Sequence, residues 1–195
     1  MVGYSLVPAN SPSFLRTLAI MHTTTDCPFC NIAKHFPPSP APKIDAYHHK
    51  ISPPAYVLLS TPLCLAFLDI LPLSSGHVLL ITRQHREKIT DVKEEESREL
   101  GVWLSKLSGA LARVTDVWDW NIVQNNGAAA AQVVNHIHFH IIPRPALTPE
   151  LRNKSFTMFG RGHRSNLVHH EAAELVKKLK LEIEKETNIS NRERL

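Results

Sequence analysis

The amino-acid sequence predicts an α+β domain, with a mostly antiparallel sheet, one long helix between strands and a C-terminal helix. Short apolar stretches flanked by Pro, Gly and Asn lie before residue 83 and after residue 119, which is typical of strands. Between them, and again after residue 170, apolar residues recur every three or four positions, as on one face of a helix. The order of strands, helix, strands and late helix favours an antiparallel sheet over the alternating units that build a parallel one.

The expected strands form two groups. The apolar segments 56–60 and 63–70 are separated by a Thr-Pro pair, which favours a hairpin, and 77–82 is a third strand. The segments 120–125 and 136–142 follow the long helix and are joined by a loop of small residues. We therefore expect five strands in one sheet.

Two amphipathic helices are expected beside a short one at Asn31–His35. The long helix covers about residues 91–114, and Asp91 with Glu94 is the candidate capping box at its start. The C-terminal helix covers about residues 171–186. The stripe that the long helix would bury consists of Leu100, Trp103, Leu104, Leu107, Leu111 and Val114.

These elements place one domain at about residues 26–145, after a flexible N-terminal tail (1–25) and before a C-terminal extension (146–195). Prolines are concentrated in 36–54, where they resist helix and central strand, so this segment is expected to be a surface loop. The extension also contains Arg161-Gly162-His163-Arg164, which is either a solvent loop or an anion contact near the site.

The composition indicates a globular protein with an anionic ligand. Hydrophobic residues make up 43% and charged residues 21%, and no apolar stretch reaches the roughly 18 residues of a membrane span. The net charge of +4 suits anions in general, but the basic residues form no single stripe, so nucleic acid is not indicated. Because the first 20 residues do not resemble a secretory signal, we expect a cytoplasmic location, with the nucleus as an additional alternative. Arg16 among serines, without acidic residues, leaves mitochondria as a weaker alternative.

The three cysteines are an odd number, which argues against a disulfide framework. Cys27 and Cys30 have the C-x-x-C spacing, which in a reducing compartment indicates either half of a tetrahedral zinc site or a redox pair. The redox alternative is the weaker one, because the βαβ pattern of thioredoxin-like proteins is absent around it. Cys64 lies in an apolar run and is expected to be a buried thiol.

Three histidines alternate with apolar residues in His136-Ile137-His138-Phe139-His140. In a strand, alternate side chains share a face, so the imidazoles would lie about 6–7 Å apart on one side. A polar outer face of an edge strand and a three-histidine zinc site are the alternatives to an active site. Burying three imidazoles without a task is costly, since each needs a partner for a ring nitrogen, and this favours a functional site.

The histidine pattern, continued by Ile141-Ile142, resembles the signature of the histidine-triad (HIT) family of nucleotide hydrolases and transferases. The resemblance covers about residues 26–145 and is strongest to Hint-type members with a C-x-x-C. It includes Cys64-Leu-Ala-Phe-Leu-Asp-Ile70, Gly76-His-Val-Leu-Leu-Ile81 and Asn125-Asn126-Gly127 through Gln132 to Pro143-Arg144, which stand in family order. It implies a HIT-like fold.

The resemblance also implies the catalytic roles. His138 would be the nucleophile that forms a covalent nucleotidyl-histidine, its other ring nitrogen fixed by a main-chain carbonyl. An imidazole suits this task because it is nucleophilic near neutral pH and leaves well when protonated. His140 and His77 would contact the phosphate and stabilise charge during transfer.

Substrate-binding roles follow from the same resemblance. Asp69 would accept hydrogen bonds from the ribose hydroxyls, while Phe67 and Ile70 would line the base pocket. Asn125 would support the phosphate site, and Gln132 would help to hold the phosphate or the leaving group. Taken alone, Asp69 is a candidate turn residue before Pro72, and Asn125 is one as well.

Two positions depart from the family pattern. Val133 stands where a Ser or Thr usually contacts the phosphate, and Ala131 stands where Gly usually precedes the Gln. The loss of a hydroxyl at Val133 removes a hydrogen bond worth about 1 kcal/mol. These departures put turnover and leaving-group preference in question.

The resemblance completes the zinc site as well. In relatives with a C-x-x-C, the pair is joined by a histidine after the His77 strand and by the first triad histidine, which are His85 and His136 here. Four protein ligands leave no open position, so the Zn²⁺ would be structural.

The expected function is hydrolysis at the α-phosphate of adenosine or other purine nucleotide derivatives, with nucleoside 5′-phosphoramidates as substrates. One alternative is a dinucleoside polyphosphate hydrolase, and another is a weakly catalytic nucleotide-binding or interaction protein, as Val133 suggests. An aprataxin-like deadenylase of nucleic-acid ends usually has a zinc finger after the triad, but residues 145–195 contain no cysteine.

The family resemblance implies a homodimer. The helix Glu94–Val114 and the following strand would pack across a two-fold axis, and Trp103, Trp118 and Trp120 supply aromatic surface there. No membrane partner is expected.

Overall fold

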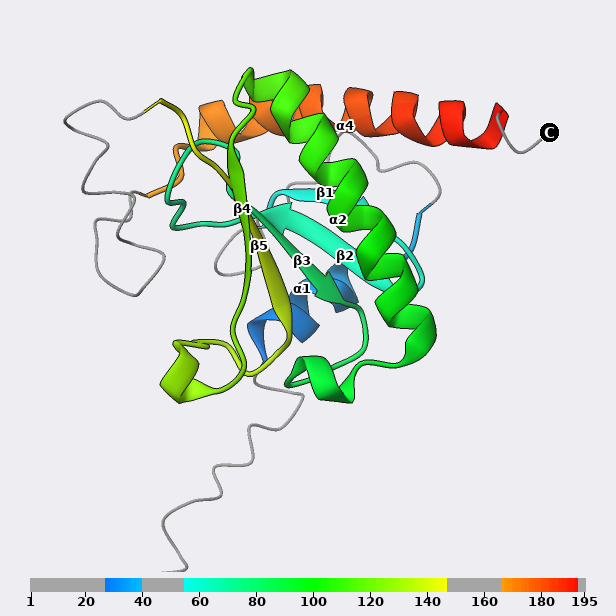
Figure 1. The fold of residues 1–195 in the computed structure, drawn as a ribbon, viewed down its shortest axis with the longest axis vertical. Helices are drawn as coiled ribbons and strands as arrows, with labels where there is room; N and C mark the ends of the chain where they lie inside the picture. The colour runs from blue at the N-terminus through cyan, green and yellow to red at the C-terminus, as the bar shows by residue number, and fades with distance from the viewer. Residues whose placement is uncertain (1–26, 40–54, 147–165, 193–195) are drawn as a thin grey trace, which may run out of the picture.

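The computed structural model describes residues 27–39, 55–146 and 166–192, which form the fold shown in Figure 1. Its five-stranded sheet has the order β1-β2-β3-β5-β4, and each neighbouring pair is antiparallel. The strands are β1 (Val57–Ser60), β2 (Cys64–Leu68), β3 (Val78–Thr82), β4 (Trp120–Gln124) and β5 (His138–Pro143). The helices are α1 (Pro28–His35), α2 (Glu94–Thr115) and α4 (His169–Arg192), with 3-10 turns η1 (Ile89–Asp91) and η2 (Ala128–Ala130). The α+β prediction is confirmed.

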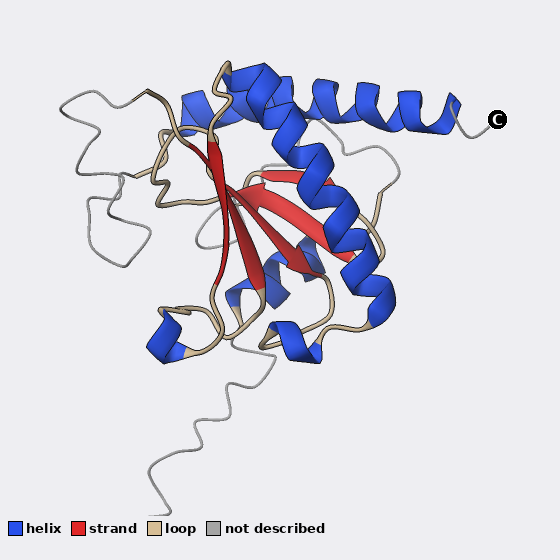
Figure 2. Cartoon of the chain, viewed as in Figure 1, coloured by secondary structure: helices blue, strands red, loops and turns tan. Residues whose placement is uncertain are grey.

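The sheet separates two apolar layers, because successive strand residues point to opposite faces. Helices α2 and α4 cover one face, as Figure 2 shows, and Leu80 of β3 packs there with Leu107 of α2. On the other face, Leu79 and Ile81 of the same strand pack with Ile32 of α1. Every residue of β3 is buried, as expected for a central strand covered on both sides.

The C-terminal helix α4 shares the core of the domain. Leu167, just before α4, donates its backbone N–H to the carbonyl of Ile70 (3.1 Å). Arg113 of α2 bonds Glu182 (2.7 Å) and Glu186, which ties the two helices together at their exposed edge. The extension therefore completes the apolar layer next to α2, and its buried residues there are Ala172, Val176, Leu179 and Ile183.

The start of the long helix differs from the prediction, so the proposed Asp91–Glu94 capping box is wrong. Asp91 ends η1 instead, and its carboxylate accepts the backbone N–H of Lys88 (2.9 Å). The helix begins at Glu94, and the N–H of Lys93 is accepted by the Glu96 carboxylate (2.9 Å). Glu96, three residues after Lys93, thus accepts the backbone N–H of the residue that precedes the helix, as in a capping box.

Some predicted segments lie outside the described residues: the N-terminal tail (1–25), most of the Pro-rich loop (40–54) and the basic Arg161–Arg164 loop. Among the described helices, none is long and apolar enough to cross a lipid bilayer.

Candidate active site and metal centre

The pairing of β3 with β5 sets the positions of the catalytic candidates. His140 lies opposite Leu79 and His138 opposite Ile81, so both imidazoles lie on the sheet face that α1 covers. Their ring centroids are 4.9 Å apart. The expected strand from 136 begins only at His138, and His136 lies in the bend before it. The predicted start of this strand at residue 136 is therefore wrong, although the ring of His136 also lies on the α1 side, 5.8 Å from the ring of Phe29.

The tautomer of His138 follows from its hydrogen bond to the backbone. Its Nδ1 lies 2.7 Å from the carbonyl oxygen of His136, and a carbonyl can only accept, so Nδ1 carries the proton. The lone pair of the neutral ring is then on Nε2, the nitrogen that a nucleophile would use. His138 is 5% exposed, and the ring of Phe29 in α1 packs edge-on against it at 5.3 Å. The strand and α1 together fix the orientation of this ring.

His77 and His140 form a second histidine pair. Nε2 of His77 lies 2.9 Å from Nδ1 of His140. Nδ1 of His77 accepts the backbone N–H of Leu73 (3.2 Å), so in the neutral state Nε2 donates to His140, whose own proton is then on Nε2. The buried Asp69 carboxylate is 3.5 Å from Nδ1 of His77, and its charge stabilises a positive charge on the pair. This pair can therefore hold and deliver a proton beside His138.

The predicted nucleoside-binding residues lie at the end of β2. The Asp69 side chain is buried, and its second oxygen accepts the Leu71 N–H (2.9 Å), which is the turn that the sequence offered as an alternative role. Ile70 is 37% exposed and so presents an apolar surface beside Asp69. Phe67 is buried and packs edge-on against Phe29 at 5.4 Å between ring centroids, so it lies behind the site surface.

The predicted phosphate-binding residues lie in the loop between β4 and β5. Asn125 directly follows β4 and is half-buried. Val133 is 92% exposed, so its apolar side chain faces solvent next to the histidine segment. Gln132 is buried, and its amide contacts three backbone groups of the protein. Ala131 has a φ of 63°, the left-handed conformation that explains why glycine suits this position.

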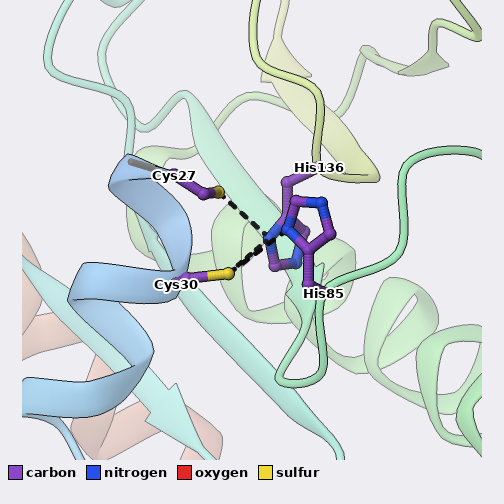
Figure 3. A group of neighbouring side chains, drawn as sticks. All are labelled: Cys27, Cys30, His85 and His136. Atoms are coloured by element: carbon purple, nitrogen blue, oxygen red, sulfur yellow. Dashed lines mark hydrogen bonds between the residues drawn. The ribbon is translucent and has the colours of Figure 1, made fainter. Parts of the chain in front are cut away.

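The four predicted zinc ligands converge on one point, as Figure 3 shows. Sγ of Cys27 lies 3.5 Å from Nδ1 of His136, and Sγ of Cys30 lies 3.6 Å from the same atom and 3.3 Å from Nδ1 of His85. In tetrahedral zinc with Zn–S near 2.3 Å and Zn–N near 2.1 Å, sulfur and nitrogen ligands are about 3.6 Å apart. The observed separations match these edges, so the four residues fit a Zn²⁺ ion.

The surroundings prepare these side chains for a cation. Nε2 of His136 donates to the Thr82 carbonyl (2.8 Å), which leaves the lone pair on Nδ1, the atom that faces the thiols. Burial lowers the pKa of His136 to about 4, so its ring is neutral at pH 7. Burial and the neighbouring Cys27 raise the pKa of Cys30 to about 12, so its thiolate forms when a metal ion displaces the proton.

Three contributors had no clear signal in the sequence. Phe29 lies inside the C-x-x-C, and only the fold shows that its ring packs against both His136 (5.8 Å) and His138 (5.3 Å). The N–H of Leu73 and the carbonyl of Thr82 act through the backbone, which any side chain at these positions would provide. The aromatic residue within the C-x-x-C was the one signal that sequence reasoning could have used.

Comparisons with known proteins agree with this geometry. Residues 51–147 match the HIT domain family. The adenosine 5′-monophosphoramidase of Schizosaccharomyces pombe is 40% identical over 92 residues, which are 47% of this chain and 66% of that protein. An uncharacterized HIT-like protein of Borreliella burgdorferi is 35% identical over 132 residues, 67% of this chain and 90% of that protein.

A solved structure extends the likeness to the fold. The Zn-bound histidine triad family protein of Mycobacterium smegmatis superposes with a TM-score of 0.60 and 24% identity, covering 83% of this chain and 98% of that one. The solved structure shows the shared fold, and the family match with the well-covered relative in Borreliella burgdorferi shows that this chain belongs to the HIT domain family.

Proposed function

We propose that this protein is a nucleotide hydrolase that cleaves at the α-phosphate of purine nucleotide derivatives, with nucleoside 5′-phosphoramidates as substrates. The observation that carries the proposal is the bond from Nδ1 of His138 to the His136 carbonyl, because it assigns the lone pair to Nε2. The names of the relatives in Schizosaccharomyces pombe and Saccharomyces cerevisiae, both adenosine 5′-monophosphoramidases, support this substrate class.

The proposed reaction has two displacement steps. In the first, Nε2 of His138 forms a bond to the α-phosphorus while the phosphorus–nitrogen bond of the phosphoramidate breaks. The leaving amine takes its proton from the His77–His140 pair, which begins the step protonated and positively charged and ends it neutral. In the second, water gives a proton back to the pair and its oxygen bonds to phosphorus as the bond to His138 breaks. The products are a nucleoside monophosphate and a free amine, and both histidine groups return to their starting states.

Dinucleoside polyphosphate hydrolysis is the second candidate. The exposed Val133 instead supports a third candidate, a weakly catalytic nucleotide-binding protein, because its side chain offers no hydrogen bond to a phosphate oxygen. A protein that binds nucleotides without turnover would leave both substrate types unchanged.

The test compares adenosine 5′-phosphoramidate with diadenosine polyphosphates on the purified full chain. We expect faster release of AMP from the phosphoramidate, loss of this activity in His138→Ala, and labelled nucleotide attached to the wild-type protein after denaturation at alkaline pH, where a phosphorus–nitrogen bond to histidine is stable. His35→Ala is the matched control, since His35 is an exposed histidine on α1. Substantial turnover by His138→Ala would exclude the covalent route through this residue.

Zn²⁺ bound by Cys27, Cys30, His85 and His136 would have a structural role, because four protein ligands leave no position for water or substrate. It would hold the start of α1 against the bend that precedes β5. Since Phe29 of α1 packs on His138, this attachment also maintains one wall of the site.

We further propose a homodimer that forms through the exposed side of β4. Trp118 is 63% exposed, Trp120 38% and Ile122 47%, and β4 is one of the two edge strands of the sheet. An apolar edge strand of this kind is usually paired or covered. Sedimentation of the purified protein should give twice the chain mass of 21.9 kDa, and Ile122→Lys should shift the protein toward monomer. A wild-type monomer at micromolar concentration would contradict the dimer.

A further inference from the structure

We propose that Gln132 is a positioning residue that joins the loop carrying His85 to the segment carrying His136, and that it does not bind the substrate phosphate. The effect on turnover rests on the proposed function, whereas the structural part does not. Gln132 lies in the loop between β4 and β5 and is 5% exposed.

The amide of Gln132 contacts three separate backbone groups. Its oxygen accepts the N–H of Gly127 (2.6 Å), and its nitrogen donates to the carbonyls of Glu87 (2.7 Å) and Val134 (3.1 Å). The backbone assigns the amide orientation, because an N–H can only donate and a carbonyl can only accept. The side chain therefore closes a bridge across three stretches of chain.

These bonds leave no donor for a phosphate. A primary amide has two N–H donors, and Gln132 uses both of them on carbonyl oxygens. The non-bridging oxygens of a phosphate are acceptors, so a contact from this side chain would require one of these bonds to break. Breaking the bond to Glu87 would remove the side-chain partner of that carbonyl, and breaking the bond to Val134 would leave the Val134 carbonyl with the His136 N–H alone, so either change weakens the contacts of the loop.

Two of the three stretches adjoin predicted metal ligands, and one of these two continues into the nucleophile. Glu87 is two residues after His85, and Val134 is two residues before His136, whose N–H bonds the Val134 carbonyl (2.8 Å). A second bond between the same two stretches runs from the Ile137 N–H to the Arg86 carbonyl (2.6 Å).

The bridge therefore acts on the nucleophile through the backbone. The carbonyl of His136 fixes the tautomer and direction of His138, so a shift of this segment misdirects Nε2. Gln132 affects the reaction by keeping this carbonyl in place, with no need for contact with the substrate.

The test is Gln132→Met, which keeps the length of the side chain and removes all three hydrogen bonds. Two measurements distinguish a bridge from a substrate contact: amide hydrogen exchange at Ile137, and steady-state kinetics on two adenosine phosphoramidates whose leaving amines differ in basicity. We expect amide hydrogen exchange at Ile137 to become roughly tenfold faster. We expect kcat to fall roughly tenfold, equally for the two substrates, with KM little changed.

Gln124→Met is the matched control, since this neighbouring glutamine bonds only Asn125 and Asn126 in its own loop among the described contacts. It should leave exchange at Ile137 and the kinetics near wild type. If Gln132→Met does not fold, Gln132→Asn tests the same bridge, because its shorter side chain keeps the amide but cannot span the three groups.

Unchanged exchange at Ile137 in a folded Gln132 variant would overturn the proposal. A raised KM, or a loss of kcat that depends on the leaving amine, would also overturn it in favour of direct substrate contact. If the protein hydrolyses neither phosphoramidate, the proposed function fails while the exchange measurement still decides the role of Gln132.

Discussion

Ala131→Gly should make the protein more stable. Ala131, which follows η2, has a φ of 63°, in the left-handed region. Ala130, the last residue of η2, has no positive φ. Both alanines are exposed, so neither substitution removes packing. The pair therefore isolates the effect of backbone conformation on the free energy of unfolding.

The expected magnitude follows from two opposing terms. A non-glycine residue in the left-handed region is less stable by about 1–2 kcal/mol, and glycine relieves this. Glycine also loses more backbone entropy on folding, which costs about 0.5–1 kcal/mol. The net gain is about 0.5–1 kcal/mol, which for a chain of 195 residues corresponds to a rise in Tm of about 1–4 °C.

The assay is urea unfolding at pH 7, followed by tryptophan fluorescence and supported by thermal melts. Ala130→Gly is the control. It should be less stable than wild type by about 0.5–1 kcal/mol, because glycine loses more backbone entropy on folding and there is no left-handed conformation at residue 130 for it to relieve. If Ala131→Gly were destabilised as much as Ala130→Gly, the reasoning from the left-handed conformation would be refuted.

Three further perturbations probe other parts of the molecule. Cys27→Ser/Cys30→Ser should abolish about one equivalent of zinc per chain and lower Tm, and metal analysis that finds no zinc in the wild type would refute the site. Asp69→Asn should reduce the preference for ribo- over deoxyribonucleoside phosphoramidates; equal kcat/KM values for the two sugars in the wild type would exclude Asp69 as the ribose acceptor. Burial raises the pKa of Glu96, but bonds from Arg86 and the Lys93 backbone outweigh this and lower it from 4.5. The ionised Glu96 carboxylate therefore stabilises the folded protein above pH 4.5, and this stabilisation is lost as the pH falls through the pKa of Glu96 in the folded state. Glu96→Gln should lower stability at pH 7 by about 1–3 kcal/mol and flatten the acid side of the stability profile, while parallel profiles would count against this assignment.

Much of the fold was accessible from the sequence, because burial imposes a period on each element. The stripe from Leu100 to Val114 predicted α2, and the apolar run 77–82 predicted β3, each within a few residues of its observed bounds. The start of α2 was misjudged because Asp91 and Glu96 can both accept a backbone N–H near a helix start. The η1 turn uses the first and the helix uses the second.

The site was predictable in its residue types and less so in its geometry. The alternating histidines indicated a functional site, and the C-x-x-C spacing indicated half of a metal site. The resemblance to the HIT family supplied the catalytic roles and the other two ligands, and Figure 3 shows the four ligands together. That His136 leaves the strand could not be read from alternation, which treats all three histidines alike. Its placement depends on Cys27, which is 109 residues away in the sequence, and no local pattern encodes such a contact.

The side chains of neighbouring residues in β5 point to opposite faces of the sheet. Phe139 packs into the layer beneath α2 and α4, while His138 and His140 on either side of it face α1. A one-residue insertion or deletion between Gly127 and His138, if the strand slipped to absorb it, would exchange the two sets. The imidazoles would enter the apolar layer and the phenyl ring would take the place of a histidine. The length of this loop is thus under tighter constraint than the identity of its exposed alanines, and changes in loop length would be far less tolerated there than substitutions.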